Sequence, residues 1–135
     1  MEEFQIWQIW SSNRIGSGLI GIGTILGVWL SMRIAMNTRN NPETNLLTKI
    51  ISSAFGLVVL AFAWINFTTI ANTWIAAARN LSDLKAGGAE VSSTADGYIA
   101  YVGTTEFSLF SGAVNGITIL QLIFNTLQAN ATPWA

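Results

Sequence analysis

The side chains that are able to do chemistry in this chain are mostly neutral amides and hydroxyls, and many lie in stretches without charge. Spaced at 100° per residue on a helix, one set falls within a sector of about 120°. This set comprises Ser111, Asn115, Thr118, Gln121 and Asn125, and a smaller set occurs earlier at Asn66, Thr69, Asn72 and Thr73. An amide that faces lipid without a partner costs several kcal/mol, so these stripes must face protein or water. They are suited to hydrogen bonds between helices or to the lining of a neutral polar pore.

The chain offers few groups for conventional catalysis. It contains no His and no Cys, so hydrolytic triads, zinc sites and typical copper sites cannot be built from its own side chains. The acid–base candidates that remain are Asp83 with Lys85 and Asp96 with Tyr98. Solvated loop charges account for both pairs more simply. We therefore expect a chain that is not an enzyme by itself and that has no metal site and no cofactor of its own.

The first apolar stretch is rich in glycine. Gly23, Gly27 and Ser31 recur every four residues, which creates a ridge of small side chains where another helix can pack closely. Residues 16–21 also match the GxGxxG pattern of dinucleotide-binding loops. No strand precedes them and the expected acidic residue about 20 positions later is missing, so the motif lacks its context. We interpret the ridge as a helix-packing face.

The composition indicates a membrane protein. Only 10% of the residues are charged, against about 25% in soluble domains, and the net charge of −1 gives no reason to expect nucleic-acid binding. Three stretches carry no charged side chain at all: residues 15–32, 50–78 and 107–135. An ionised group at bilayer mid-depth costs at least ~3 kcal/mol, and a helix needs about 20 residues to cross the hydrocarbon. These stretches therefore have the length and composition of membrane spans.

We predict an all-α, polytopic chain with three transmembrane helices in one membrane domain. Its parts are an interfacial segment at 1–12, a first span at 15–36, a long helix at 42–86 with the second span, an extramembrane loop at 87–105 and a third span at 107–128. A cleaved signal peptide is the alternative for the first span. That stretch is long for a signal peptide and lacks a small-residue cleavage pattern before Asn37, so we expect it to be retained.

Local signals set the expected ends of the second helix. Asn41, Pro42 and Glu43 have the order of an N-cap, a first-turn proline and a first-turn acid. Gly87 and Gly88 suit a helix C-terminus. Some 45 residues would span roughly 67 Å, about twice the hydrocarbon thickness, so we expect this helix to protrude from the membrane.

The loop between the second and third predicted helices contains a turn signal. Asp96 followed by Gly97 is typical of a tight hairpin turn. Residues 98–102 are rich in β-formers and therefore predict one strand of a hairpin. A lone hairpin is only marginally stable in water, so this one should rest on another part of the protein.

Aromatic residues lie near the ends of the apolar stretches. Trp7 and Trp10 belong to the N-terminal segment, and Tyr98 and Tyr101 to the second loop. Indole and phenol rings prefer the headgroup region of a bilayer, so we expect all four to be interfacial anchors. An arm that packs on a partner protein is an equally good interpretation of the N-terminal segment.

The distribution of cations favours one orientation. Lys and Arg are divided equally between the two sides of a three-span chain, as Arg33, Arg39 and Lys49 against Arg14, Arg79 and Lys85. Because the first three surround one short loop, residues 37–48 are expected to face the cytoplasm. The expected location is a multi-pass position in a bacterial inner or intracytoplasmic membrane.

These features favour a non-catalytic accessory subunit of a larger membrane complex. Three helices bury few internal faces, yet each carries a glycine, hydroxyl or amide face that requires a polypeptide partner. We expect larger membrane subunits and lipids as partners. By association with machines that carry small non-catalytic subunits, we favour a respiratory, photosynthetic or monooxygenase host. The alternative is a small homo-oligomeric channel lined by the polar stripe of the third span.

Overall fold

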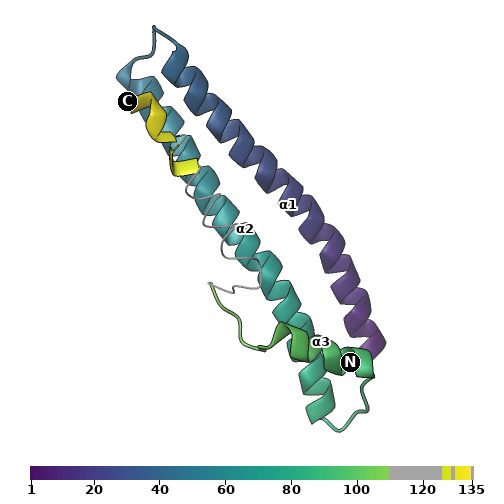
Figure 1. Ribbon diagram of the computed structural model, residues 1–135. Coiled ribbons are helices and arrows are strands. Elements are labelled where there is room, and N and C mark those ends of the chain that lie inside the picture. The colour runs from purple at the N-terminus through teal and green to yellow at the C-terminus, as the bar shows by residue number, and fades with distance from the viewer. Residues whose placement is uncertain (110–125, 129, 135) are drawn as a thin grey trace. The chain divides into compact units, whose positions relative to one another are not determined.

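The computed structural model describes residues 1–109, 126–128 and 130–134 and is all-helical there. Its elements are α1 (Glu3–Asn40), α2 (Leu46–Ala86), α3 (Ser93–Val102) and the short 3-10 helix η1 (Thr132–Trp134), as Figure 1 shows. The predicted all-α class is therefore confirmed for these residues. Helices α1 and α2 are each long and apolar enough to cross a membrane. Most of the third predicted span lies outside the described residues. Of that span's described ends, Phe107 and Ser108 are not helical, whereas residues 126–128 are.

The chain forms two compact units, and α1 and α2 contribute to both. Unit 1 contains residues 1–19 and 67–109, with the N-terminal part of α1, the C-terminal part of α2 and all of α3. Unit 2 contains residues 20–66 and the C-terminal residues 126–128 and 130–134. Each unit has its own packing.

Helix α1 is a single helix of 38 residues. The interfacial segment predicted at 1–12 is therefore not a separate short helix, because it continues into the span predicted at 15–36. Its placement at the membrane interface stays a prediction. Residues 11–14 contain neither Gly nor Pro, so nothing there interrupts the backbone hydrogen bonds. Glu3 in the first turn and Arg39 in the last turn complement the helix dipole.

Helix α2 begins later than the sequence predicts. Asn45 caps it, because the Asn45 Oδ1 accepts a hydrogen bond from the Thr48 N–H at 2.9 Å. Asn41, the predicted cap, instead accepts from the Glu43 N–H at 3.0 Å in a local turn. The chain therefore uses the same capping chemistry one turn downstream, and α2 runs for 41 residues to Ala86.

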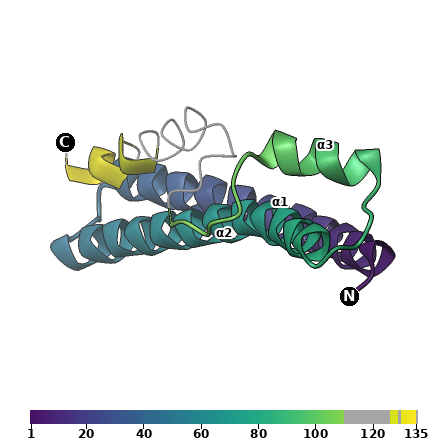
Figure 2. The same ribbon diagram turned by 90° about the horizontal axis from the view of Figure 1, so that it is seen from below.

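The predicted hairpin strand at 98–102 is wrong, because these residues belong to α3. The Ser92 Oγ caps α3 by accepting from the Ala95 N–H at 3.2 Å. Gly103 ends the helix in the left-handed conformation, with φ 71°. Figure 2 shows α3 on one side of the two long helices of unit 1. Cap residues at both ends and burial of one face thus outweigh the β-propensity of the sequence.

The core of unit 1 lies where three helices meet. Ile6 of α1, Ala77 and Leu81 of α2, and Ala95 of α3 are buried together. Small alanines on two of the three helices allow the backbones to approach closely. This core fixes the position of α3 against the N-terminal end of α1.

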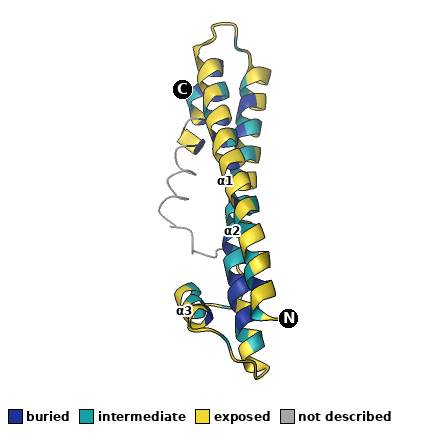
Figure 3. Ribbon diagram, turned by 90° about the vertical axis from the view of Figure 1, so that its right-hand side faces the viewer, coloured by how far each residue is buried: buried dark blue, intermediate teal, exposed yellow. Residues whose placement is uncertain are grey.

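Unit 2 is packed through small side chains. Buried residues recur along α1 at spacings of four and three, at Thr24, Val28, Ser31, Ala35 and Thr38. This spacing is typical of two helices packed along a left-handed seam. On α2 the buried positions include Ser52, Gly56 and Ala63. Figure 3 shows this narrow buried line against the largely exposed outer surface of unit 2.

Candidate functional site

The most organised group of side chains is an aromatic cluster in unit 1, formed by Trp7, Trp10, Trp74 and Tyr98. Tyr98 lies at its centre, and its ring centroid is 5.3 Å from that of Trp7 and 6.0 Å from that of Trp10, both edge-to-face. The rings of Tyr98 and Trp74 stack with centroids 6.1 Å apart. Edge-to-face and offset-stacked pairs of this kind add about 0.5–1.5 kcal/mol each beyond burial. The cluster therefore joins α1, α2 and α3.

Hydrogen bonds fix the polar atoms of the aromatic cluster. The Trp10 Nε1–H donates to the Tyr98 hydroxyl at 2.8 Å, and that hydroxyl donates to the Trp74 backbone carbonyl at 3.2 Å. The Trp7 Nε1–H donates to the Glu3 carboxylate at 2.9 Å. Each of these partly buried polar groups thus has a partner, which makes the cluster rigid.

The environment of Tyr98 keeps its phenol protonated. Burial raises the pKa of Tyr98 above the ordinary value, and the hydrogen bond from Trp10 and the charge of Arg14 offset part of the rise. A protonated phenol is required here, because its O–H is the donor to the Trp74 carbonyl. The protonated Tyr98 hydroxyl thus connects the Trp10 side chain of α1 to the backbone of α2.

Two polar contacts hold the N-terminal half of α3. The Glu3 carboxylate accepts from the Ser92 backbone N–H at 2.8 Å and from the Ser92 hydroxyl at 2.5 Å. Lys85 and Asp96 form an ion pair at 2.6 Å. Both are exposed and so are screened by water, and their main effect is to fix the orientation of α3.

A second group, in unit 2, joins the C-terminal residues to the α1–α2 pair. The Asn130 Nδ2–H donates to the Ser31 hydroxyl at 3.0 Å and to the Thr126 carbonyl at 2.8 Å. The Asn130 amide lies directly against Gly56, so that a Cβ at Gly56 would collide with it. The Trp134 Nε1–H donates to the Ser53 hydroxyl at 2.7 Å. The buried Asn130 side chain therefore connects the C-terminal segment to α1 and α2 within unit 2.

The predicted glycine ridge divides into three different environments. Ser31 is fully buried and bonded to Asn130, as described above. Gly27 faces Val59 of α2, with 3.8 Å between the Val59 Cγ1 and a Cβ placed on Gly27. Gly23 is exposed, and no described atom lies within 4 Å of a Cβ placed there. One end of the ridge thus belongs to the packing of unit 2, and the other end is open in the described part of the chain.

The amides of α2 bond to other segments. The Asn66 Nδ2–H donates to the Thr24 hydroxyl on α1 at 2.9 Å. Asn72 pairs with the backbone of Ser108, as donor to its carbonyl at 3.2 Å and as acceptor from its N–H at 3.3 Å. Thr69 lies on an exposed part of α2. The predicted stripe at Asn115, Thr118, Gln121 and Asn125 lies outside the described residues.

Three of the four predicted aromatic anchors come together in the aromatic cluster. Tyr101 is 77% exposed, and its ring is tilted by 45° to that of Trp74 with the centroids 6.2 Å apart. Trp74 is not among the predicted site residues, yet it contacts three other rings. The spacing of Trp7 and Trp10 places both on one face of a helix. This shared face is the feature of the sequence that could have indicated a third aromatic residue packed against them. Whether these residues lie at a membrane interface stays a prediction.

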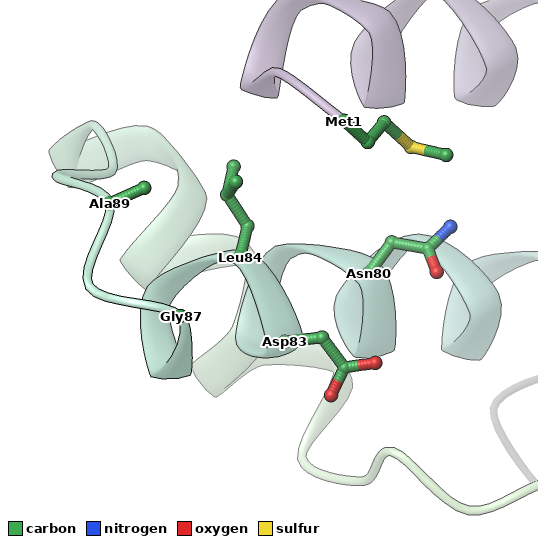
Figure 4. A pocket seen from close by; sticks show the side chains of 6 residues that line it. All are labelled: Met1, Asn80, Asp83, Leu84, Gly87 and Ala89. Carbon is green, nitrogen blue, oxygen red and sulfur yellow. The ribbon is translucent and has the colours of Figure 1, made fainter.

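An open hollow occurs near the end of α2 in unit 1 (Figure 4). Its volume is about 360 Å³, and it is lined by Met1, Asn80, Asp83, Leu84, Gly87 and Ala89. Of these six side chains only Asp83 carries a charge, and its Oδ2 lies 4.0 Å from the Arg79 Nε in an exposed ion pair. Within the described residues no three His, Cys, Asp or Glu side chains gather as a metal site. The ionisable side chain among these six is thus engaged in an exposed ion pair.

Comparisons with known proteins give no family. No protein-family model, no curated protein and no solved structure matches this chain.

Proposed function

We propose that this chain is a non-catalytic accessory subunit of a larger membrane protein complex. Its host would be an oxidoreductase or energy-transducing assembly of the respiratory, photosynthetic or monooxygenase kind, a preference that rests on association alone. In this role α1 and α2 cross the bilayer, and the chain stabilises larger subunits through the faces of its helices.

The inverted polarity of unit 2 is the observation that carries the proposal. Its buried seam contains hydroxyls, glycine and alanine, whereas its large apolar side chains point outward. The exposed set includes Ile22, Ile25, Leu26, Trp29, Leu57, Val58, Phe62 and Ile65. A water-soluble protein buries such side chains, because each contributes about 1.5–3 kcal/mol when removed from water. Lipid removes that driving force and favours close packing of small residues.

A soluble helical core is the main alternative, and the burial of α1 and α2 argues against it. In the most apolar stretch of each helix, only 22% of α1 and 17% of α2 is buried. The core helices of a soluble domain are mostly buried. An apolar surface of this extent requires lipid or protein around it.

The third crossing is also part of the proposal. Ser108, near the start of the third uncharged stretch, pairs with Asn72 in unit 1. Asn130, near its end, bonds to Ser31 in unit 2. The intervening stretch contains no charged residue and therefore meets the composition of a span.

The open end of the glycine ridge supports a role in assembly. A glycine in a helix costs about 1 kcal/mol relative to alanine, and in membranes this cost is offset by close contact with another helix. No described residue provides that contact at Gly23. We therefore assign the Gly23 surface to a neighbouring subunit.

The test is recovery of the host complex with Gly23→Leu. This change should reduce co-purification of larger subunits from native membranes at least several-fold, because the added side chain prevents close helix approach. Ala61→Leu is the matched control, since Ala61 is exposed on α2 and the substitution adds bulk elsewhere. Native mass spectrometry of the complex extracted with its lipids measures the recovery of larger subunits with each variant.

The outcomes separate the candidate functions. Equal recovery of both variants would contradict assembly through Gly23. A stoichiometric homo-oligomer that conducts ions in liposomes would support the channel instead. Catalytic turnover by the purified chain would contradict both.

A further inference from the structure

Arg14 differs from the other side-chain cations of unit 1. Its Cζ lies 4.6 Å from the ring centroid of Trp74, and it is only partly exposed. The other cations of this unit each have an acid within 4.0 Å, in the pairs Lys85–Asp96 and Arg79–Asp83. Arg14 has an aromatic face in place of a carboxylate.

The charge of Arg14 is therefore not neutralised within the described residues. No carboxylate there comes within 4.0 Å of its guanidinium, and residues 110–125 and 129 contain no Asp or Glu. Glu3, eleven residues earlier on α1, is engaged by Ser92 and Trp7. A partly buried cation without a counter-ion favours the binding of an anion.

The geometry suits a phosphate. A guanidinium that lies over an aromatic ring keeps its N–H groups at its edge, where they can donate two parallel hydrogen bonds to one anion. Contact with Trp74 holds the side chain in one place and lowers the entropy lost on binding.

The surroundings point to a phosphate that carries acyl chains. Arg14 is the last residue before the uncharged stretch 15–32. Ile15, which directly follows Arg14, and Leu19, about one turn further along α1, are 69% and 68% exposed. Gly18 lies one turn along from Arg14, and no described atom is within 4 Å of a Cβ placed there. A strip of apolar surface with a notch at Gly18 thus leads away from the guanidinium.

We propose that Arg14, held over Trp74, binds the phosphodiester of an anionic phospholipid whose acyl chains lie along Ile15, Gly18 and Leu19. A net anionic lipid is preferred over a zwitterionic one, because it supplies the missing counter-charge. This inference rests on the membrane placement in the proposed function and names one specific lipid position on the chain.

The experiment uses the full chain in phosphatidylcholine nanodiscs that contain a minority of phosphatidylglycerol. Native mass spectrometry of the released protein counts the lipids of each kind that stay bound. Arg14→Gln should lower the preference for phosphatidylglycerol about tenfold, because the substitution removes a charge-assisted bidentate contact. Arg39→Gln is the matched control, because it removes the same charge from an exposed position on the same helix and should leave the preference unchanged.

Each other outcome overturns the inference in a defined way. Equal losses in the two variants would show general charge attraction, and no preference in the unmodified chain would show that the lipid site does not exist. Displacement of phosphatidylglycerol by inorganic phosphate at similar concentration would show a free-anion site.

A second variant is used if Arg14→Gln does not insert into the nanodisc. Arg14→Lys keeps the positive charge but lacks the two parallel N–H donors of the guanidinium, so an undiminished preference for phosphatidylglycerol would contradict bidentate binding. A chain that never enters nanodiscs contradicts the proposed function itself, whereas one that inserts without lipid preference contradicts only this inference.

Discussion

Tyr98 shows at the scale of one residue how three helices are joined. Its ring contacts indoles of α1 and α2, and its hydroxyl both accepts from Trp10 and donates to the Trp74 carbonyl. Tyr98→Phe keeps the ring but leaves the partly buried Trp10 N–H without its acceptor. We expect a loss of about 1–3 kcal/mol in the docking of α3. Hydrogen exchange of the α3 amides measures this loss.

The exposed Tyr101 is the control for that experiment. Tyr101→Phe removes a hydroxyl from a side chain that is 77% exposed, so exchange should change by less than about 0.5 kcal/mol. Similar effects of the two substitutions would contradict the role of the Tyr98 hydroxyl.

The raised pKa of Tyr98 predicts an alkaline transition. Because burial raises the folded pKa above the unfolded one, the protonated phenol contributes stability at all pH values below about 10. That contribution is lost as the pH rises through the folded pKa. Near-ultraviolet circular dichroism of the indoles should therefore stay constant through neutral pH and change only in alkali. Tyr98→Phe should lack this step, and a transition that persists in the variant would have another origin.

Gly56 predicts a different effect of a single methyl group. Gly56→Ala places a Cβ against the Asn130 amide, so we expect a destabilisation of about 1–3 kcal/mol. Thermal unfolding in detergent, followed by far-ultraviolet circular dichroism, measures it. Gly23→Ala is the control and should leave stability unchanged or slightly raised, because no described atom opposes it. Equal stability of both variants would contradict the contact.

The sequence indicates the chemistry of these residues better than their partners. Trp7 and Trp10 fall on one face of a helix by spacing alone. Their contact with Trp74 depends on the register between α1 and α2, which no local pattern specifies. The contact of Asn130 with Ser31 joins residues 99 positions apart and has no sequence signal for the same reason.

At the scale of elements, α3 shows why local propensity is insufficient. Residues 98–102 favour a strand, but Ser92 and Gly103 supply a cap at each end of a helix. Helical spacing also brings Ala95 into the core and Tyr98 into the aromatic cluster, which an extended chain would not do. Tertiary contacts therefore decide the conformation of this segment.

Two glycines, Gly97 within α3 and Gly103 at its C-cap, give opposite predictions for substitution by alanine. Gly103 has φ 71°, which alanine adopts only with strain, so Gly103→Ala should destabilise α3 by about 1 kcal/mol. Gly97 lies within the helix and no described atom is near its Cβ position, so Gly97→Ala should stabilise α3 by up to about 1 kcal/mol. Hydrogen exchange of the α3 amides measures the change in stability for both variants and therefore its sign. A stabilising Gly97→Ala would also contradict any role of Asp96-Gly97 as a hairpin turn.

For α1 and α2, sequence length and composition were sufficient to identify the helices, because their apolar stretches are long. Their ends were less certain. Asn41 and Asn45 carry the same side chain, and only the structure shows which one caps α2.

At the scale of the whole molecule, the proposed three crossings predict which residues lie on the same side of the membrane. The chain has no Cys, so a single introduced Cys reports its location through a membrane-impermeant maleimide. Glu43→Cys and Ala131→Cys should react from one side of the membrane, and Ser93→Cys from the other. All three positions are exposed. Reaction of Ala131→Cys from the side of Ser93→Cys would contradict the third crossing, and reaction of Glu43→Cys from outside the cytoplasm would contradict the expected orientation.

The position of Asn130 has a consequence for biogenesis. Ribosomes add residues from the N-terminus at about 5–20 per second, so α1 and α2 are complete several seconds before Asn130 is made. Until then the Ser31 hydroxyl and the space beside Gly56 lack the side chain that fills them. Unit 2 is consequently finished only after translation of its last turns, and a nascent chain stalled before residue 130 would present quality-control proteases with an incomplete helix pair.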